Sequence, residues 1–315
     1  MEIDFMLKLI FCCVFCCFTS YSGAQDHNKE ASIEIDSFFQ PSENFNKKRG
    51  VYTSVGVASA WTGSMIGLHQ VWYKQVEKSS WNTFDDSKSW LQMDKAGHFY
   101  TSYKLNALTT DLYRWSGMQT KYATWLGITV SIGFQTTLEF FDAHTQDWGW
   151  SWTDFSTNIF GASSYAAQIH FWNEERFIPK FSYSPTPFAE IRPSVLGRTF
   201  SERLLKDYNG QTYWLSFSPG SFFKNKRIPE WACVSIGYSA HEKLVGSASY
   251  FTDPETGQDY FEQREILISL DIDFSKISVK RPWIRTFLQQ LNHLKVPFPT
   301  LLFRNGNVLL KPLYF

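Results

Sequence analysis

Between residues 94 and 158 the chain places ionisable and amide side chains within long apolar segments. Three pairs of these residues are each separated by four positions: Asp94 with His98, Gln135 with Glu139, and Asp154 with Asn158. Residues at this spacing lie on one face of a helix. Carboxylates and imidazoles are costly to desolvate unless they pair, bind a cation or become neutral. We therefore expect three helices to present polar pairs to a shared interior.

The residue types in these pairs are suited to binding a divalent metal or to transferring protons. Carboxylate oxygens and imidazole nitrogens bind Mg²⁺, Mn²⁺, Ca²⁺ or Zn²⁺, and helical bundles build carboxylate sites in this way. The predicted metal ligands are Asp94, His98, Glu139, Asp142 and Asp154. As catalytic candidates, His98 is a general base and Glu139 an acid. His144 and Asp147 belong to the same stretch.

A purely structural role fits the same residues. In that interpretation Lys95 and His98 are the cations of a buried polar network, with Gln135 and Asn158 as further members. Asp94 then caps the N-terminus of its helix, and His98 is a hydrogen-bonded core residue. The residues by themselves leave the functional and structural interpretations open.

Four apolar runs are expected to form the helices that position these side chains. They cover Val51 to Tyr73, Asp94 to about Tyr113, Tyr122 to Phe141, and Asp154 to about Phe171. Small residues interleaved with aromatic ones are typical of closely packed or membrane helices. The sequence therefore predicts a membrane-associated four-helix bundle over residues 51–178.

After Pro179 the composition changes and apolar residues alternate with polar ones, as in strands. Such runs start near Tyr213, Ala232, Ile266 and Asn307. Between Ile266 and Phe274 we expect the apolar side chains on one face and Asp271 and Asp273 on the other. Residues 283–294 predict a short amphipathic helix. The predicted fold class is α+β, with the helical bundle followed by a β-rich region over residues 179–315.

The N-terminus has the features of a secretory signal peptide over residues 1–24. Lys8 is the positive flank, residues 9–18 are the apolar segment, and Ser22-Gly23-Ala24 is the cleavage site. Residues 25–50 are polar and predict a mobile leader. Four of the five cysteines lie in the signal segment, so cleavage leaves only Cys233, which cannot form an internal disulfide.

Composition limits the class of partner. The net charge is zero, so no nucleic-acid partner is expected. The aromatic fraction of 18% favours packed cores and membrane–water interfaces. The signal segment predicts an exported location. The aromatic strand that ends at Phe315 is compatible with the outer membrane.

Residues 90–172 resemble the YfiM-like family of predicted periplasmic lipoproteins (domain of unknown function 2279). The resemblance rests on residues 94–99 (Asp-Lys-Ala-Gly-His-Phe), on Phe134-Gln135 with Glu139 and Asp142, and on residues 151–154 with Asn158 and Gly161. More remotely, the layout is similar to VanZ-type membrane proteins, which have an Asp-Lys-x-x-His segment and a later Asp-x-x-x-Asn-x-x-Gly helix. Unlike a lipoprotein, the chain has Val14-Phe15 before Cys16, where a small residue is expected.

The resemblance implies a protein of the bacterial cell envelope, in the periplasm and associated with a membrane, with an envelope lipid as partner. It names no reaction, so two hypotheses follow. The first is a structural or scaffolding protein with a buried polar cluster, and it is preferred because no motif identifies a reaction. The second is a metal-dependent enzyme or binder that acts on an amphiphilic envelope molecule, such as a lipid or glycan precursor. Convergence of Asp94, His98, Glu139 and Asp154 in one pocket would favour the second hypothesis.

Overall fold

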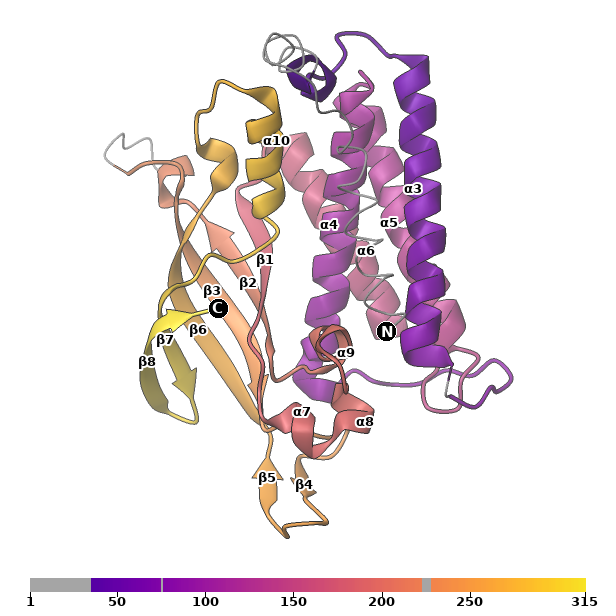
Figure 1. Ribbon diagram of the computed structural model, residues 1–315, viewed down its shortest axis with the longest axis vertical. Helices are drawn as coiled ribbons and strands as arrows, with labels where there is room; N and C mark the ends of the chain where they lie inside the picture. Colours follow the sequence, from indigo (N-terminus) through magenta and orange to yellow (C-terminus); the bar gives the residue numbers. More distant parts are fainter. Residues whose placement is uncertain (1–34, 75, 223–227) are drawn as a thin grey trace, which may run out of the picture.

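The computed structural model describes residues 35–74, 76–222 and 228–315 (Figure 1). The predicted signal peptide and the first part of the predicted leader lie outside these residues. The fold is α+β, with a layer of long helices beside an antiparallel sheet. The helices of this layer are α3 (Lys47–Leu68), α4 (Met93–Trp115), α5 (Thr120–Asp142) and α6 (Trp152–Trp172).

The expected four-helix bundle takes the form of a three-helix core. Helices α4, α5 and α6 pack against one another, whereas α3 lies alongside with few contacts. Most of α3 is exposed, and only Gly50, Thr53 and Met65 are buried in it. A π-helical turn, His69–Tyr73, continues α3 and brings Tyr73 to the end of α5. Among the described helices, none is both long and apolar enough to cross a membrane.

Helix α3 begins earlier than the sequence predicts, inside the segment assigned to the leader. The side chain of Asn46 accepts a hydrogen bond from the backbone N–H of Arg49, so the helix is capped there and starts at Lys47 rather than Val51. The Arg49 guanidinium also donates to the carbonyl of Trp115 at the end of α4. These contacts attach residues 46–49 to the helical core.

Close backbone approach between α4 and α6 defines the interior in which the polar pairs meet. A Cβ atom at Gly161 would lie 2.4 Å from the carbonyl oxygen of Phe99, so only glycine fits this crossing. Nearby, the Asn106 side chain donates to the carbonyl of Ala162 at 2.8 Å. The Ser131 hydroxyl of α5 donates to the carbonyl of Ser102 at 2.7 Å. The three helices are thus held together by polar as well as apolar contacts.

Six strands form the main sheet in the order β1-β2-β3-β6-β7-β8. They are β1 (Phe177–Tyr183), β2 (Gln211–Phe217), β3 (Ala232–His241), β6 (Gln263–Ile272), β7 (Phe298–Arg304) and β8 (Asn307–Tyr314). A hairpin is formed by β4 (Tyr250–Thr252) and β5 (Asp259–Phe261). Short helices connect the strands: α7 (Phe188–Ile191), α8 (Pro193–Leu196), α9 (Phe200–Lys206) and α10 (Pro282–Leu291). Of these, α10 is the amphipathic helix expected from Trp283, and it ends at Leu291 instead of Leu294.

Strand β6 has an exposed aliphatic face and a buried face that is polar except for Leu267. Ile266, Ile268 and Leu270 are exposed, whereas Asp271 is buried. Burial of Asp271 is tolerated because Lys180 of β1 lies 2.9 Å from its Oδ2 atom. Asp273 is not in the strand: it follows β6 and accepts a hydrogen bond from the Ser275 N–H in the next turn.

Candidate metal centre

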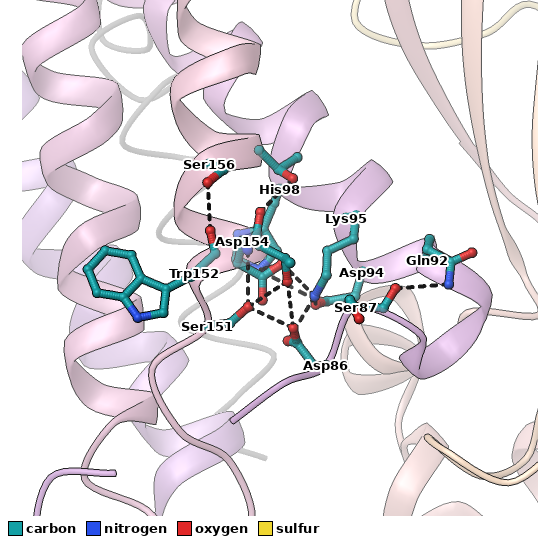
Figure 2. Close-up of polar contacts among 12 residues, drawn as sticks. Asp86, Ser87, Gln92, Asp94, Lys95, His98, Ser151, Trp152, Asp154 and Ser156 are labelled. Atoms are coloured by element: carbon teal, nitrogen blue, oxygen red, sulfur yellow. Dashed lines mark hydrogen bonds and ion pairs between the residues drawn. The ribbon is translucent and has the colours of Figure 1, made fainter. Parts of the chain in front are cut away.

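The polar pairs meet where the N-terminal ends of α4 and α6 lie beside the C-terminal end of α5 (Figure 2). Ser151 caps α6 by accepting a hydrogen bond from the Asp154 N–H, which fixes Asp154 in the first turn. Asp94 is also in the first turn of its helix, but it does not cap it, because the capping position is Gln92. Helix N-termini carry partial positive charge, which favours both carboxylates.

Lys95 is the basic residue at the centre of the carboxylates. Its Nζ atom lies 2.7 Å from Asp154 Oδ1, 2.8 Å from Asp86 Oδ2 and 3.2 Å from Asp94 Oδ2, and Figure 2 shows these side chains converging. In the contact with Asp94 the ammonium group donates a hydrogen bond. The ammonium group therefore links α4, α6 and the loop before α4 through charge.

His98 presents its two ring nitrogens to different neighbours. Nε2 lies 3.6 Å from Asp94 Oδ1 and 3.8 Å from Asp154 Oδ1. Nδ1 lies 3.0 Å from Asn158 Oδ1 and 3.7 Å from Glu139 Oε1. Because an amide oxygen only accepts hydrogen bonds, this contact assigns the donor role to Nδ1. In neutral His98 the unprotonated Nε2 then faces the two aspartates.

Asn158 joins the three helices from the other side of His98. Its Oδ1 atom accepts from Gln135 Nε2 at 2.9 Å and from the Ser102 hydroxyl at 3.1 Å, in addition to its contact with His98. Asn158 and Gln135 are buried. Asn158 of α6 is thus hydrogen-bonded to side chains of both α4 and α5.

Glu139 is nearly inaccessible to solvent, with 1% of its surface exposed. Its Oε2 atom accepts a hydrogen bond from the Ser151 N–H at 3.3 Å. Its Oε1 atom points toward His98 and accepts no hydrogen bond from any described residue. A buried carboxylate with an unsatisfied oxygen requires a proton or a cation.

Three residues named by the sequence analysis do not join the convergent atoms. Asp142 accepts a hydrogen bond from the Tyr73 hydroxyl at 2.7 Å, which holds its carboxylate toward α3 rather than among the ligand atoms of Asp94, His98 and Asp154. The prediction of Asp142 as a ligand is thus not met by the geometry. His144 packs on Phe140 and contacts its carbonyl, and Asp147 is exposed.

Two site residues were missed because they come from segments without helical periodicity. Asp86 lies in the loop before α4, where its Oδ1 atom accepts from the hydroxyls of Ser151 at 2.6 Å and Thr153 at 2.9 Å. Tyr208 follows α9 and donates its hydroxyl to Asp94 Oδ1 at 3.0 Å. No sequence spacing connects either residue with the polar pairs.

The cluster holds more carboxyl groups than basic groups. Its carboxyl groups are those of Asp86, Asp94, Glu139 and Asp154, and the basic side chains that the described residues place beside them are Lys95 and His98. Burial raises the pKa of Glu139 to about 7, and the nearby Asp142 adds to this. Burial and the charge of Asp94 also raise the pKa of Asp154. The surplus negative charge is therefore relieved by proton uptake when no further cation is bound.

His98 is held in its protonated form over an unusually wide pH range. Burial lowers its pKa, but the charges of Asp94, Asp154 and Glu139 outweigh this and raise it to about 9. The same carboxylates would also stabilise a metal ion on Nε2, which competes with the proton.

We expect the free energy of unfolding to fall as the pH rises from about 4.5 to about 9, by roughly 1–3 kcal/mol. Both folded-state pKa values lie above the ordinary ones, 4.5 for Glu139 and 6.5 for His98, so the folded protein holds these protons more tightly. The contribution of Glu139 is complete below pH 4.5 and lost through pH 7; that of His98 is complete below pH 6.5 and lost through pH 9. Denaturant unfolding at a series of pH values measures this, and His98→Gln should flatten the alkaline part. A stability that rises over this range would contradict the electrostatic account.

Residues 80–169 match the model of a family described as predicted periplasmic lipoprotein (DUF2279). This segment contains the cluster residues from Asp86 to Asn158 but not the sheet or Tyr208. The family description supports an exported location in the cell envelope. The comparisons do not show the YfiM-like and VanZ-type relationships. Searches of curated proteins and of solved structures gave no match.

Proposed function

We propose that this chain is an exported envelope protein that binds a divalent cation through Asp94, His98 and Asp154. One observation carries the proposal: one ligand atom from each of these residues lies within 4.8 Å of the other two. The surplus of carboxyl groups and the unsatisfied Glu139 oxygen support it, because both favour an additional positive charge.

The two separations that involve His98 suit a small divalent ion. With bonds of about 2.0–2.1 Å to a tetrahedral ion, ligand atoms are about 3.4 Å apart. The distances from His98 Nε2 to the two aspartate oxygens, 3.6 and 3.8 Å, need only a small contraction. Asn158 supplies the partner for the second ring nitrogen that metal-binding histidines require. One imidazole with two carboxylates is a ligand set suited to Zn²⁺ or Mn²⁺.

Lys95 and a bound cation can share the carboxylates. Asp94 contacts Lys95 through Oδ2 and faces His98 through Oδ1, so its two oxygens are already divided between the two positions. Asp154 uses one oxygen, Oδ1, toward both Lys95 and His98 and must therefore shift when a cation binds. We expect Lys95 to stay in place and neutralise part of the surplus charge.

The ligand class that fits such a cation is an amphiphilic envelope molecule with an anionic head group. The Asp94 side chain is 25% exposed, the largest exposed fraction among the three candidate ligands. Trp152, two residues before Asp154, is 64% exposed and offers an apolar ring at the same end of α6. A lipid or a lipid-linked glycan precursor would use both features.

A second candidate function is a scaffold in which the network only holds the helices in register. The three ion pairs of Lys95 and the three hydrogen-bonding partners of Asn158 favour it, because they connect α4, α5, α6 and the preceding loop without any further ion. The two candidates differ in whether a divalent cation binds.

Isothermal titration of chelator-treated protein with Mn²⁺ or Zn²⁺ distinguishes the two candidates. We expect saturable binding that tightens from pH 6 to pH 8, because the ligands must lose protons. Asp154→Asn should lower the affinity for the cation by about 100-fold. Losing a residue that only supports a metal ligand costs up to this much, and Asp154 is itself a proposed ligand. Asp147→Asn, at an exposed position outside the cluster, is the matched control and should bind as the natural chain does. Absence of binding to the natural chain would leave the scaffold as the better account.

A further inference from the structure

The outer face of the main sheet is aliphatic, whereas its inner face combines buried polar side chains with a small apolar cluster of Trp214, Leu267 and Leu302. One row of neighbouring residues crosses five strands in register: Leu215, Ile236, Ile268, Leu301 and Leu310. Every member of this row is exposed, from 40% at Leu215 to 66% at Leu310. The flanking rows of the described strands, which start at Tyr213 and Phe217, also consist of uncharged apolar or aromatic residues.

The inner face carries the charges. Lys180 and Asp271 are fully buried and lie 2.9 Å apart, and Asp271 also accepts from the Ser216 hydroxyl at 2.6 Å. The Lys295 ammonium donates to the carbonyl of Leu270 at 2.7 Å. These contacts bind the polar side chains to one another, so the sheet cannot exchange its faces without leaving buried charges unpaired. The outward position of the aliphatic row is therefore fixed.

The aliphatic face is convex because the sheet curls around its polar side. Strands β2 and β8 are four strand spacings apart, which is about 19 Å in a flat sheet. The rings of Trp214 and Tyr314 are nevertheless centred only 6.0 Å apart across the inner face. The Thr212 and Tyr314 hydroxyls meet there at 3.0 Å. Curling that brings inner side chains together bends the outer face away from them.

Part of this convex face is already covered by the chain itself. Tyr100 of α4 packs against Phe181 of β1 and Tyr213 of β2, with ring centres 5.9 Å apart in both pairs. The exposed aliphatic row lies on the same face, beyond the part that α4 covers. The face therefore has two adjoining sectors: one is buried against α4, and the other is equally apolar but is not covered by any described residue.

We propose that the exposed sector, from Leu215 to Leu310, contacts the hydrocarbon chains of an envelope lipid layer. Its lack of charge across three rows matches hydrocarbon and would be costly against water. Its convexity selects a fluid cover, because acyl chains conform to a curved surface. A second copy of the same rigid convex face would touch it only along a line. The inference uses the proposed envelope location but none of the cation ligands.

A fluorophore attached to the face tests this contact directly. The full chain, with its native cysteines replaced by serine, carries Ile268→Cys labelled with an environment-sensitive dye. It is reconstituted with vesicles of phosphatidylethanolamine and phosphatidylglycerol whose acyl chains bear nitroxide. We expect loss of fluorescence at position 268. Gln258→Cys, in the exposed β4–β5 loop, is the control and should keep its fluorescence.

A second variant measures how much the face contributes to binding. Ile236→Asp with Ile268→Asp places charges on two neighbouring exposed positions and should lower partition into the same vesicles at least about tenfold. Circular dichroism checks that the sheet remains folded. Vesicle-bound protein with a bright dye at position 268, or a chain that does not bind vesicles at all, would overturn the proposal. Protection of that dye from aqueous iodide without quenching by lipid nitroxide would mean a protein cover and would overturn it too.

Discussion

We expect Lys95→Met to lower the free energy of unfolding by roughly 3–5 kcal/mol near neutral pH. The substitution removes the ammonium group from Asp86, Asp94 and Asp154, all of which lie within 3.2 Å of it. Methionine fills a similar volume, so the loss comes from the unpaired carboxylates and not from a cavity. Equilibrium denaturation followed by circular dichroism gives the value. Lys88→Met is the matched control. Lys88 is exposed in the loop before α4, so its loss should change stability little.

The same variant also responds to cations. If Asp94, His98 and Asp154 bind Mn²⁺ or Zn²⁺, the added ion should recover part of the lost stability, since it supplies the missing positive charge. Lowering the pH should recover part of it as well, because the carboxylates then take up protons. A Lys95→Met protein as stable as the natural chain would show that Lys95 does not balance the carboxylates.

Lys180→Met should destabilise the sheet by a comparable amount, roughly 3–5 kcal/mol. Lys180 and Asp271 are both fully buried, and the Lys180 ammonium also donates to the carbonyl of Ile272 at 2.7 Å. Removing the lysine leaves Lys295, 3.8 Å away, as the remaining cation that the described residues place beside the Asp271 carboxylate. Thermal and denaturant unfolding report this loss, and Lys311→Met on exposed β8 is the control.

A compensating substitution separates charge from packing in this pair. Lys180→Met combined with Asp271→Asn should be more stable than Lys180→Met alone, because the amide can still accept from Ser216 and carries no charge. Equal stability of the single and double variants would mean that Lys180 acts through packing of its methylene chain.

The long helices could be predicted from the sequence because each is a largely apolar segment of helical length whose polar residues recur at helical spacing. Their arrangement could not. The exposure of α3 depends on which other helices its few buried residues, such as Met65, pack against. The composition of α3 does not determine those contacts. The first turn of α3 depends on the cap at Asn46. The cap was not recognised in the sequence because Asn46 lies in a segment with many other polar residues.

The strands were predicted where alternation is uninterrupted, as in β6. Strands β1 and β7 contain Pro179 and Pro299, which weaken the strand pattern. Alternation assigns residues to two faces but does not identify the buried one. The polar face is inside here because Lys180 neutralises Asp271, and these residues are 91 positions apart in the chain.

The convergence of Asp94, His98, Glu139 and Asp154 could be anticipated because helical spacing places each pair on one face. The role of these residues remains a proposal. Asp86 and Tyr208 could not be anticipated, since their contacts depend on a loop and on a segment from the other half of the chain. Asp142 was assigned by spacing alone, and the hydrogen bond from Tyr73 turns it away from the ligand atoms.

Anomalous diffraction from crystals of the full chain grown with Zn²⁺ tests the cation site most directly. The account predicts one strong peak at the zinc edge, bonded to His98 Nε2 and to a carboxylate oxygen of Asp94 and of Asp154, with Lys95 still paired to the second oxygen of Asp94. A map with no peak at this position at saturating Zn²⁺, and with Lys95 still contacting all three aspartates, would contradict it.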